Sequence, residues 1–346
     1  MIDNYSKQIN GLGSVADKSM SWLKENSLIY NSLNKALLGS NQLQFAIPIF
    51  GGSGDNFKTI DPWHHVFFEA EQDLDSAILL LLSGFYKDSF RAMRSFLELH
   101  IFALYNFVNE DKDNFTNWLE GKNQTPKLYI LLQSLDDKSE GFKKINKELN
   151  WSEEVKLLYK ELSGFMHTQG ALHTHTSLRN SNQTVFSDEG IKLGSTLLLR
   201  AIRLTSAGFV VNFPMSLHPL PLFNKFAFSP PAGGFLDDGQ VDDIRSIFQD
   251  DVAIKLSEIS LSNEDSVSLV ESIKSMPDLT EQEVLDSLKK VLESEEFKNS
   301  RQDILEMIKN DEFGKAIAIV VSTQRAMMRA INGILFNPFY DKCGNR

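Results

Sequence analysis

The chain has 346 residues, of which 42% are hydrophobic and 23% are charged, enough for one elaborated domain or two. Its single cysteine, Cys343, excludes disulfide scaffolds and cysteine-based zinc sites. No apolar run reaches the roughly 18–20 residues that a membrane span needs, and the first residues lack a secretory signal pattern. We therefore expect a cytoplasmic protein with no membrane partner.

The net charge of −11 is unevenly distributed along the chain. Residues 236–313 hold 8 Lys and Arg against 21 Asp and Glu, a local charge of −13, which leaves +2 for the remainder. A globally acidic chain is a poor general nucleic-acid binder. The near-neutral remainder still has room for a local basic pocket, and the acidic segment is typical of a solvated helical surface.

The N-terminal region predicts a helix over residues 14–38 that ends at Gly39. Residues 41–60 are expected to form a loop, with a short strand at residues 45–50. The glycine cluster at residues 51–54 lacks the Gly-Lys-Ser/Thr ending of a phosphate-binding loop, so it is interpreted as a turn.

Two long helices are predicted over residues 61–108, joined at Ser83-Gly84-Phe85. Asp61 and Pro62 suit the start of the first helix, and Gly84 suits a left-handed cap at its end. The short link and the apolar stripe on each helix predict an antiparallel hairpin. The second helix also carries polar residues that stand out in this apolar setting: Arg91, Arg94, Glu98 and His100.

Further helices follow from apolar residues at helical spacing. They are expected around residues 115–119, 128–135, 151–166, 191–213, 241–259, 264–275, 280–296, 301–310 and 313–335. Thr280 and Glu283 fit a capping box at the start of one of them. The chain is therefore predicted to be all-α.

Prolines and glycines at residues 214–240 mark the best domain boundary, although interleaved phenylalanines indicate that this segment packs on a surface. The predicted organisation has four parts. They are an N-terminal helix and loop (1–60), a helical bundle (61–213), a Pro/Gly/Phe-rich linker (214–240) and an acidic helical C-terminal domain (241–346).

The order of parts over residues 61–168 resembles the HEPN-like helical domains, which occur in prokaryotic toxins, abortive-infection systems and phage-defence proteins. The resemblance depends on the stretch from Gly84 to Glu98 and on Tyr159-Lys160-Glu161-Leu162-Ser163-Gly164-Phe165-Met166-His167. It covers about a third of the chain and does not extend to the C-terminal half.

The resemblance implies a possible chemistry, because active members use an Arg, four to six residues and a His as a metal-independent RNase across a dimer. Arg94 and His100 match that spacing. A His can exchange protons with the ribose hydroxyl while an Arg holds the phosphate. However, residues six apart on a helix are about 120° apart around its axis, so these two do not share a face.

Two other interpretations remain open. Arg94 and Glu98 can form a structural ion pair that fixes the hairpin to a neighbouring helix, which we favour over a catalytic use. A ligand pocket formed by Arg91, Arg94, Glu98 and His167 is the second interpretation. The histidines His167, His173 and His175, with Asp188, form only a weak candidate zinc site, so no metal or cofactor is predicted.

These patterns lead us to expect a binding or regulatory subunit of a prokaryotic anti-phage defence assembly. Its expected partners are other protein subunits or a second copy of itself. The first alternative is an RNase that uses Arg94 and His100 across a dimer, with RNA as substrate. The second alternative is a nucleotide or metal sensor that uses Arg91, Arg94 and His167.

Overall fold

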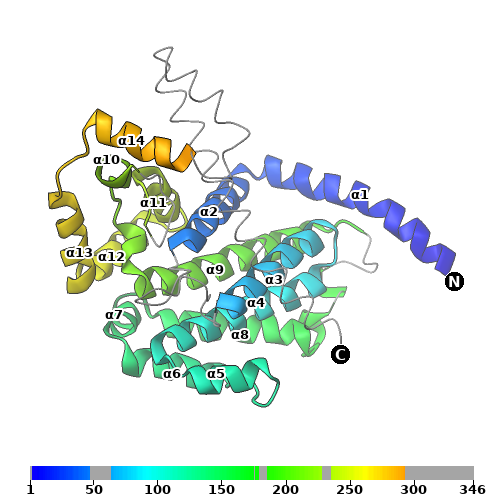
Figure 1. Cartoon of the computed structure of the whole chain (residues 1–346). Helices are drawn as coiled ribbons and strands as arrows, with labels where there is room; N and C mark the ends of the chain where they lie inside the picture. Colours follow the sequence, from blue (N-terminus) through cyan, green and yellow to red (C-terminus); the bar gives the residue numbers. More distant parts are fainter. Residues whose placement is uncertain (1, 47–63, 175, 179–184, 228–234, 293–346) are drawn as a thin grey trace, which may run out of the picture.

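The computed structural model describes residues 2–46, 64–174, 176–178, 185–227 and 235–292 (Figure 1). In these ranges it has fourteen α-helices and no β-strand, which confirms the predicted all-α class. The helices are α1 (Ile2–Glu25), α2 (Ser27–Ala46), α3 (His64–Leu82), α4 (Tyr86–Asn109), α5 (Lys112–Leu119), α6 (Leu128–Lys138), α7 (Glu140–Leu149), α8 (Trp151–Met166), α9 (Asp188–Asn212), α10 (Leu222–Phe226), α11 (Asp238–Arg245), α12 (Asp250–Leu261), α13 (Glu264–Ser275) and α14 (Glu281–Leu292).

The hairpin predicted from the sequence is formed by α3 and α4, which pack closely along their length. Gly84 has a φ of +83°, and the Phe85 N–H donates to the Leu80 carbonyl at 2.9 Å, so the left-handed cap is confirmed. The Ser89 hydroxyl donates to the Ala77 carbonyl at 2.7 Å and ties the two helices together near the turn. The predicted start at Asp61 lies outside the described residues.

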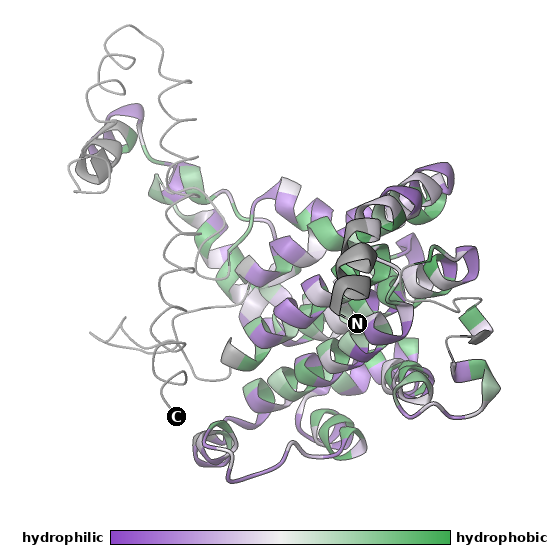
Figure 2. Ribbon diagram, turned by 90° about the vertical axis from the view of Figure 1, so that its right-hand side faces the viewer, coloured by the Kyte–Doolittle hydropathy of each residue, from purple (hydrophilic) through white to green (hydrophobic). Residues whose placement is uncertain are grey.

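Helices α4 and α9 form the centre of the molecule, with α3, α8 and α6 packed on α4 and with α2, α7 and α12 packed on α9 (Figure 1). The surrounding helices alternate apolar and polar segments along their length, as amphipathic helices do (Figure 2). One apolar core runs from Leu23 in α1 to Ile259 in α12. It includes side chains from both sides of the predicted linker.

Helix α9 is long and apolar enough to cross a membrane by length and composition alone. However, 72% of its most apolar window is buried inside the protein. Its small residues allow this close packing, since a Cβ at Gly190 would lie 2.5 Å from the Tyr86 ring. Such burial is typical of a core helix rather than of a membrane span.

The helix predicted over residues 14–38 is two helices, because the chain bends at Asn26. The Asn26 side chain donates to the Trp22 carbonyl at 2.8 Å, in addition to the bond that the Asn26 backbone N–H makes to the same carbonyl at 3.0 Å. On the N-terminal side of the bend, α1 extends away from the body of the molecule (Figure 1).

Helix α2 continues through Gly39, where the sequence predicted its end, and reaches Ala46. The glycine has a packing role instead: a Cβ at this position would lie 2.5 Å from the Asp243 carbonyl and 2.4 Å from Ile247 Cγ1. Gly39 therefore lets α2 cross α11 at close range. The strand expected at residues 45–50 is contradicted at its first two residues, which belong to α2, and the rest lies outside the described residues.

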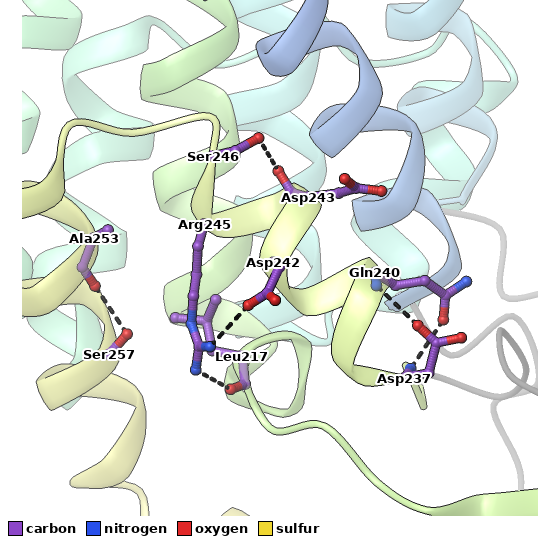
Figure 3. A network of polar contacts seen from close by, with 9 residues as sticks. All are labelled: Leu217, Asp237, Gln240, Asp242, Asp243, Arg245, Ser246, Ala253 and Ser257. Carbon is purple, nitrogen blue, oxygen red and sulfur yellow. Dashed lines mark hydrogen bonds and ion pairs between the residues drawn. The ribbon is translucent and has the colours of Figure 1, made fainter.

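Two further differences concern helix boundaries. Helix α7 was not predicted, and the helix expected over residues 241–259 is interrupted between α11 and α12. At that interruption the Ser246 hydroxyl donates to the Asp243 carbonyl at 2.7 Å (Figure 3), and Ile247 is fully buried. Side-chain bonding and burial of the turn therefore outweigh the helical pattern.

The segment at 214–240 is only partly irregular, since it contains a short 3-10 helix at Pro214–Leu217 and the helix α10. Leu217 and Leu236 belong to the main core, whereas Leu220 and Leu222 pack with Val270 and Ile273 of α13 in a second, small cluster. An Asp237–Gln240 capping box starts α11 (Figure 3).

The predicted capping box at α14 is confirmed. The Thr280 N–H donates to the Glu283 carboxylate at 2.8 Å, and the Glu283 N–H donates to the Thr280 hydroxyl at 3.3 Å. The helices predicted at 301–310 and 313–335, and the glycine cluster at 51–54, lie outside the described residues.

Candidate functional site

The polar residues singled out on α4 lie on different sides of that helix. Residues of the apolar stripe, such as Phe90, Met93 and Leu97, are fully buried in the core. Arg94 leans against α8, while His100 points into the interior toward α3 and α9. The six-residue spacing between Arg94 and His100 produces this separation, as helical geometry requires.

Arg94 joins α4 to α8 through several contacts. Its Nη2 donates to the Tyr159 hydroxyl at 2.6 Å, its guanidinium carbon lies 4.6 Å from the centroid of the same ring, and its Nη1 contacts the Met166 sulfur. Glu98 is 3.8 Å away and only 30% exposed, so it partly balances the charge. The Arg94 side chain is 14% exposed, and its contacts make it a clamp between two helices.

Lys87 makes a second connection to the same end of α8. It is buried, and its Nζ donates to the Thr168 hydroxyl at 2.5 Å, just beyond the end of α8. Two cations, Lys87 and Arg94, therefore meet the C-terminal end of this helix, where the helix dipole is negative and stabilises positive charge. This arrangement accounts for Lys87 and Arg94 of α4 without a ligand.

Arg91 and His167, the other candidate ligand-binding residues, are exposed. Arg91 forms an ion pair with Asp88 at 2.7 Å on its own helix. His167 ends α8 and follows Met166, so it lies beside the contact made by Arg94. Arg91 is thus exposed on α4 and His167 at the end of α8, whereas Arg94, which lies between the two helices, is largely covered.

His100 is buried in an aromatic enclosure. Its Nδ1 lies 3.0 Å from the Phe96 carbonyl, its Nε2 lies 3.2 Å from Glu71 Oε1, and the rings of Phe67 and Phe209 have centroids 5.1 and 5.3 Å from it. The imidazole is 3% exposed. A phosphodiester cannot reach this ring without displacement of the surrounding helices.

The partner of His100 was not recognised from the sequence. Glu71 of α3 accepts a hydrogen bond from Gln44 of α2 at 2.8 Å through Oε2, while its Oε1 faces His100, so side chains of three helices meet at this carboxylate. Burial, together with the negative charge of Glu71, raises the pKa of the neighbouring Asp75. The sequence did contain a signal for this contact, because Glu71 and His100 each lie beside the apolar stripe of one helix in a predicted antiparallel hairpin.

The candidate metal ligands do not converge in the described part of the chain. His173 packs its ring against Phe165 and Gly164, and its Nδ1 lies 2.6 Å from the Gln169 carbonyl. His167 is exposed, and His175 lies outside the described residues. Among described residues, no three His, Cys, Asp or Glu side chains are grouped so as to hold a metal ion.

A buried pair that sequence reasoning missed lies between the 3-10 helix and α12. His218 Nε2 is 3.1 Å from the Ser260 hydroxyl, which donates to the Pro214 carbonyl at 2.8 Å. Because the hydroxyl proton is engaged by a backbone carbonyl, the serine is not activated as a nucleophile. The pair fixes the connection after α9 to α12.

The buried His218 makes the stability of the folded protein depend on pH. Burial lowers the pKa of His218, and the positive charges of Lys274 and Arg245 act in the same direction, while the bond to Ser260 opposes them. Above the unfolded pKa of about 6.5, the imidazole is neutral in both states. As the pH falls below that value, the unfolded chain takes up the proton first, so stability decreases until the folded pKa is reached.

We expect His218→Gln to make the loss of stability below about pH 6.5 shallower, because the variant lacks this proton uptake. The measurement is the urea midpoint of wild type and variant at a series of pH values from neutral downward. The difference between the two curves isolates His218 from the other titrating groups. Parallel curves over the whole range would show that this imidazole does not contribute.

The chain matches none of the protein-family models, curated proteins or solved structures with which it was compared. Functional inference therefore depends on the geometry of its own residues.

Proposed function

We propose that this chain is a HEPN-like helical subunit that works by binding other proteins in a prokaryotic anti-phage defence assembly in the cytoplasm. The observation that supports a binding role over a catalytic one is the separation of Arg94 from His100. Arg94 is held by Tyr159 and Met166 on one side of α4, and His100 is enclosed by Phe67 and Phe209 on another. Both residues have internal roles that account for their presence.

The RNase alternative requires both side chains at one substrate phosphate. In the described geometry this would need α8 to release Arg94 and α3 or α9 to uncover His100. The sensor alternative has a specific observation in its favour, because Arg91 and His167 are both exposed and therefore accessible to a ligand. A ligand there would have to compete with Asp88 for Arg91, and with Glu98 and Tyr159 for Arg94.

The catalytic question is tested with purified wild type, Arg94→Ala and His100→Ala, each incubated with tRNA and with total RNA. Arg91→Ala, an exposed arginine one turn away, is the matched control. We expect the four proteins to give the same RNA pattern as buffer. Cleavage by wild type and Arg91→Ala that is lost in the other two variants would overturn the binding proposal in favour of the RNase.

The binding question is tested by co-expressing the chain with the products of its neighbouring reading frames, followed by size-exclusion chromatography with light scattering. We expect a complex of defined stoichiometry with at least one product. A chain that elutes as a single copy with every product would contradict the proposal.

A further inference from the structure

A cavity of about 190 Å³ lies where the start of α8, the middle of α9 and the start of α12 meet. Its walls are mainly apolar, and they come from the rings of Trp151 and Phe248 and the side chains of Leu149, Leu204 and Val252. Since one water occupies about 30 Å³ in the liquid, the space corresponds to about six waters. A space of this size suits a small molecule.

Arg203 is the one cation among the described residues that line this mainly apolar space. The Nε of Arg203 donates to the Ile247 carbonyl at 2.9 Å, which holds the side chain in place. No carboxylate of the described residues forms an ion pair with Arg203, whereas Arg91, Arg94, Arg200 and Arg245 each have one within 4 Å. Burial lowers the pKa of Arg203, as expected for a positive charge that no neighbour compensates.

The acidic side chains described near the cavity do not form an ion pair with Arg203. Glu154 also lines the cavity, and its carboxylate is 3.7 Å from Arg200, which also pairs with Glu161 at 3.0 Å. Asp250 and Asp251 begin α12, and both are exposed. Arg203 thus remains the group to which a buried anion would bind.

The first turn of α12 adds a second feature that favours an anion. Gln249 is the N-cap residue, makes no side-chain cap bond and lines the cavity together with Val252. The N–H groups and the dipole of such a turn attract an anion, although the carboxylates of Asp250 and Asp251 in the same turn oppose this attraction. An anionic group held by Arg203 would lie between a guanidinium and this helix start.

We propose that this cavity binds a small free carboxylic acid with an aromatic or branched apolar body. The planar guanidinium of Arg203 matches a carboxylate, which can accept two parallel hydrogen bonds from it. The apolar body would pack on Trp151 and Phe248, whose rings provide large contact areas. This site is distinct from the Arg94 region and does not depend on the proposed binding role.

The test uses benzoate as the probe and benzamide as its neutral counterpart of the same shape, with binding followed by calorimetry and by ligand-observed NMR. Wild type is expected to bind benzoate at least about tenfold more tightly than benzamide, because a charge-assisted bond to the guanidinium is lost in the amide. Equal binding of both probes, or none of benzoate, would overturn the proposal.

Two variants locate the site on the full chain. Arg203→Met is expected to weaken benzoate binding at least about tenfold, while Lys192→Met, which removes an exposed cation of the same helix outside the cavity lining, leaves it unchanged. Ala207→Leu fills the cavity next to Arg203 while keeping the cation in the chain, and it is expected to abolish binding. Unfolding curves verify that each variant is folded. If a variant does not fold, the comparison of benzoate with benzamide on the wild-type protein still tests the proposal.

Two outcomes would overturn the assignment to a free acid in this cavity. The first is tight benzoate binding by Ala207→Leu, which would place the probe elsewhere. The second is stronger binding of a short peptide ending in phenylalanine than of benzoate, which would assign the site to a protein C-terminus.

Discussion

Replacing Phe209 with alanine is expected to lower the free energy of unfolding by about 3–5 kcal/mol. The ring is 1% exposed and lies at the junction of three central helices. Its centroid is 4.8 Å from that of Phe67 in α3 and 5.3 Å from that of the His100 imidazole in α4. The substitution removes buried apolar area and also leaves a cavity next to a buried polar group, so both costs add.

Denaturant unfolding followed by far-ultraviolet circular dichroism measures this effect. Phe226→Ala is the matched control, because that ring is 48% exposed on α10 and its loss is expected to change stability by no more than about 0.5 kcal/mol. A loss below about 1 kcal/mol for Phe209→Ala would show that α9 does not pack against α3 and α4 in this way.

The second large effect is expected at Gly39. Alanine normally favours a helix over glycine by about 1 kcal/mol, but here the added methyl group would meet the Asp243 carbonyl at 2.5 Å. Because that oxygen belongs to the backbone of α11, relief requires the two helices to separate. We expect Gly39→Ala to destabilise the protein by about 2 kcal/mol, typical of overpacking. The α2–α11 contact includes the bond from Gln42 to Asp243 at 3.5 Å, and Figure 3 shows α11 beside α2.

Gly13→Ala is the control for this prediction, since nothing lies within 4 Å of a Cβ at that position of α1. The same chemical change is therefore expected to increase helix content without loss of stability. Far-ultraviolet circular dichroism and thermal unfolding of both variants give the comparison. Equal effects of the two substitutions would show that α2 and α11 are not in close contact.

Periodic elements of the fold were predictable from the sequence, because local spacing specifies them. The hairpin of α3 and α4 with its Gly84 cap and the start of α14 at Thr280 agree with expectation. Gly39 was misinterpreted because a glycine signals either a helix end or a close crossing, and its neighbour Asp243 is about two hundred residues away in the sequence. No local pattern contains that information.

The candidate site was predictable only in part, for a similar reason. Helical geometry alone indicated that Arg94 and His100 point in different directions. Their partners Tyr159 and Glu71 depend on which helices pack beside α4, which spacing within α4 does not reveal. Arg203, which pairs with no carboxylate among the described residues, was visible in the sequence only as a charge that interrupts an apolar helix.

The central position of α9 has a consequence for biosynthesis. The ribosome delivers α3, α4 and α8 before α9, but α12, which covers another side of it, emerges only afterward. For that interval the nascent chain displays a long apolar surface, which is a substrate for chaperones and a source of aggregation. Premature termination shortly after Asn212 would make that temporary exposure permanent.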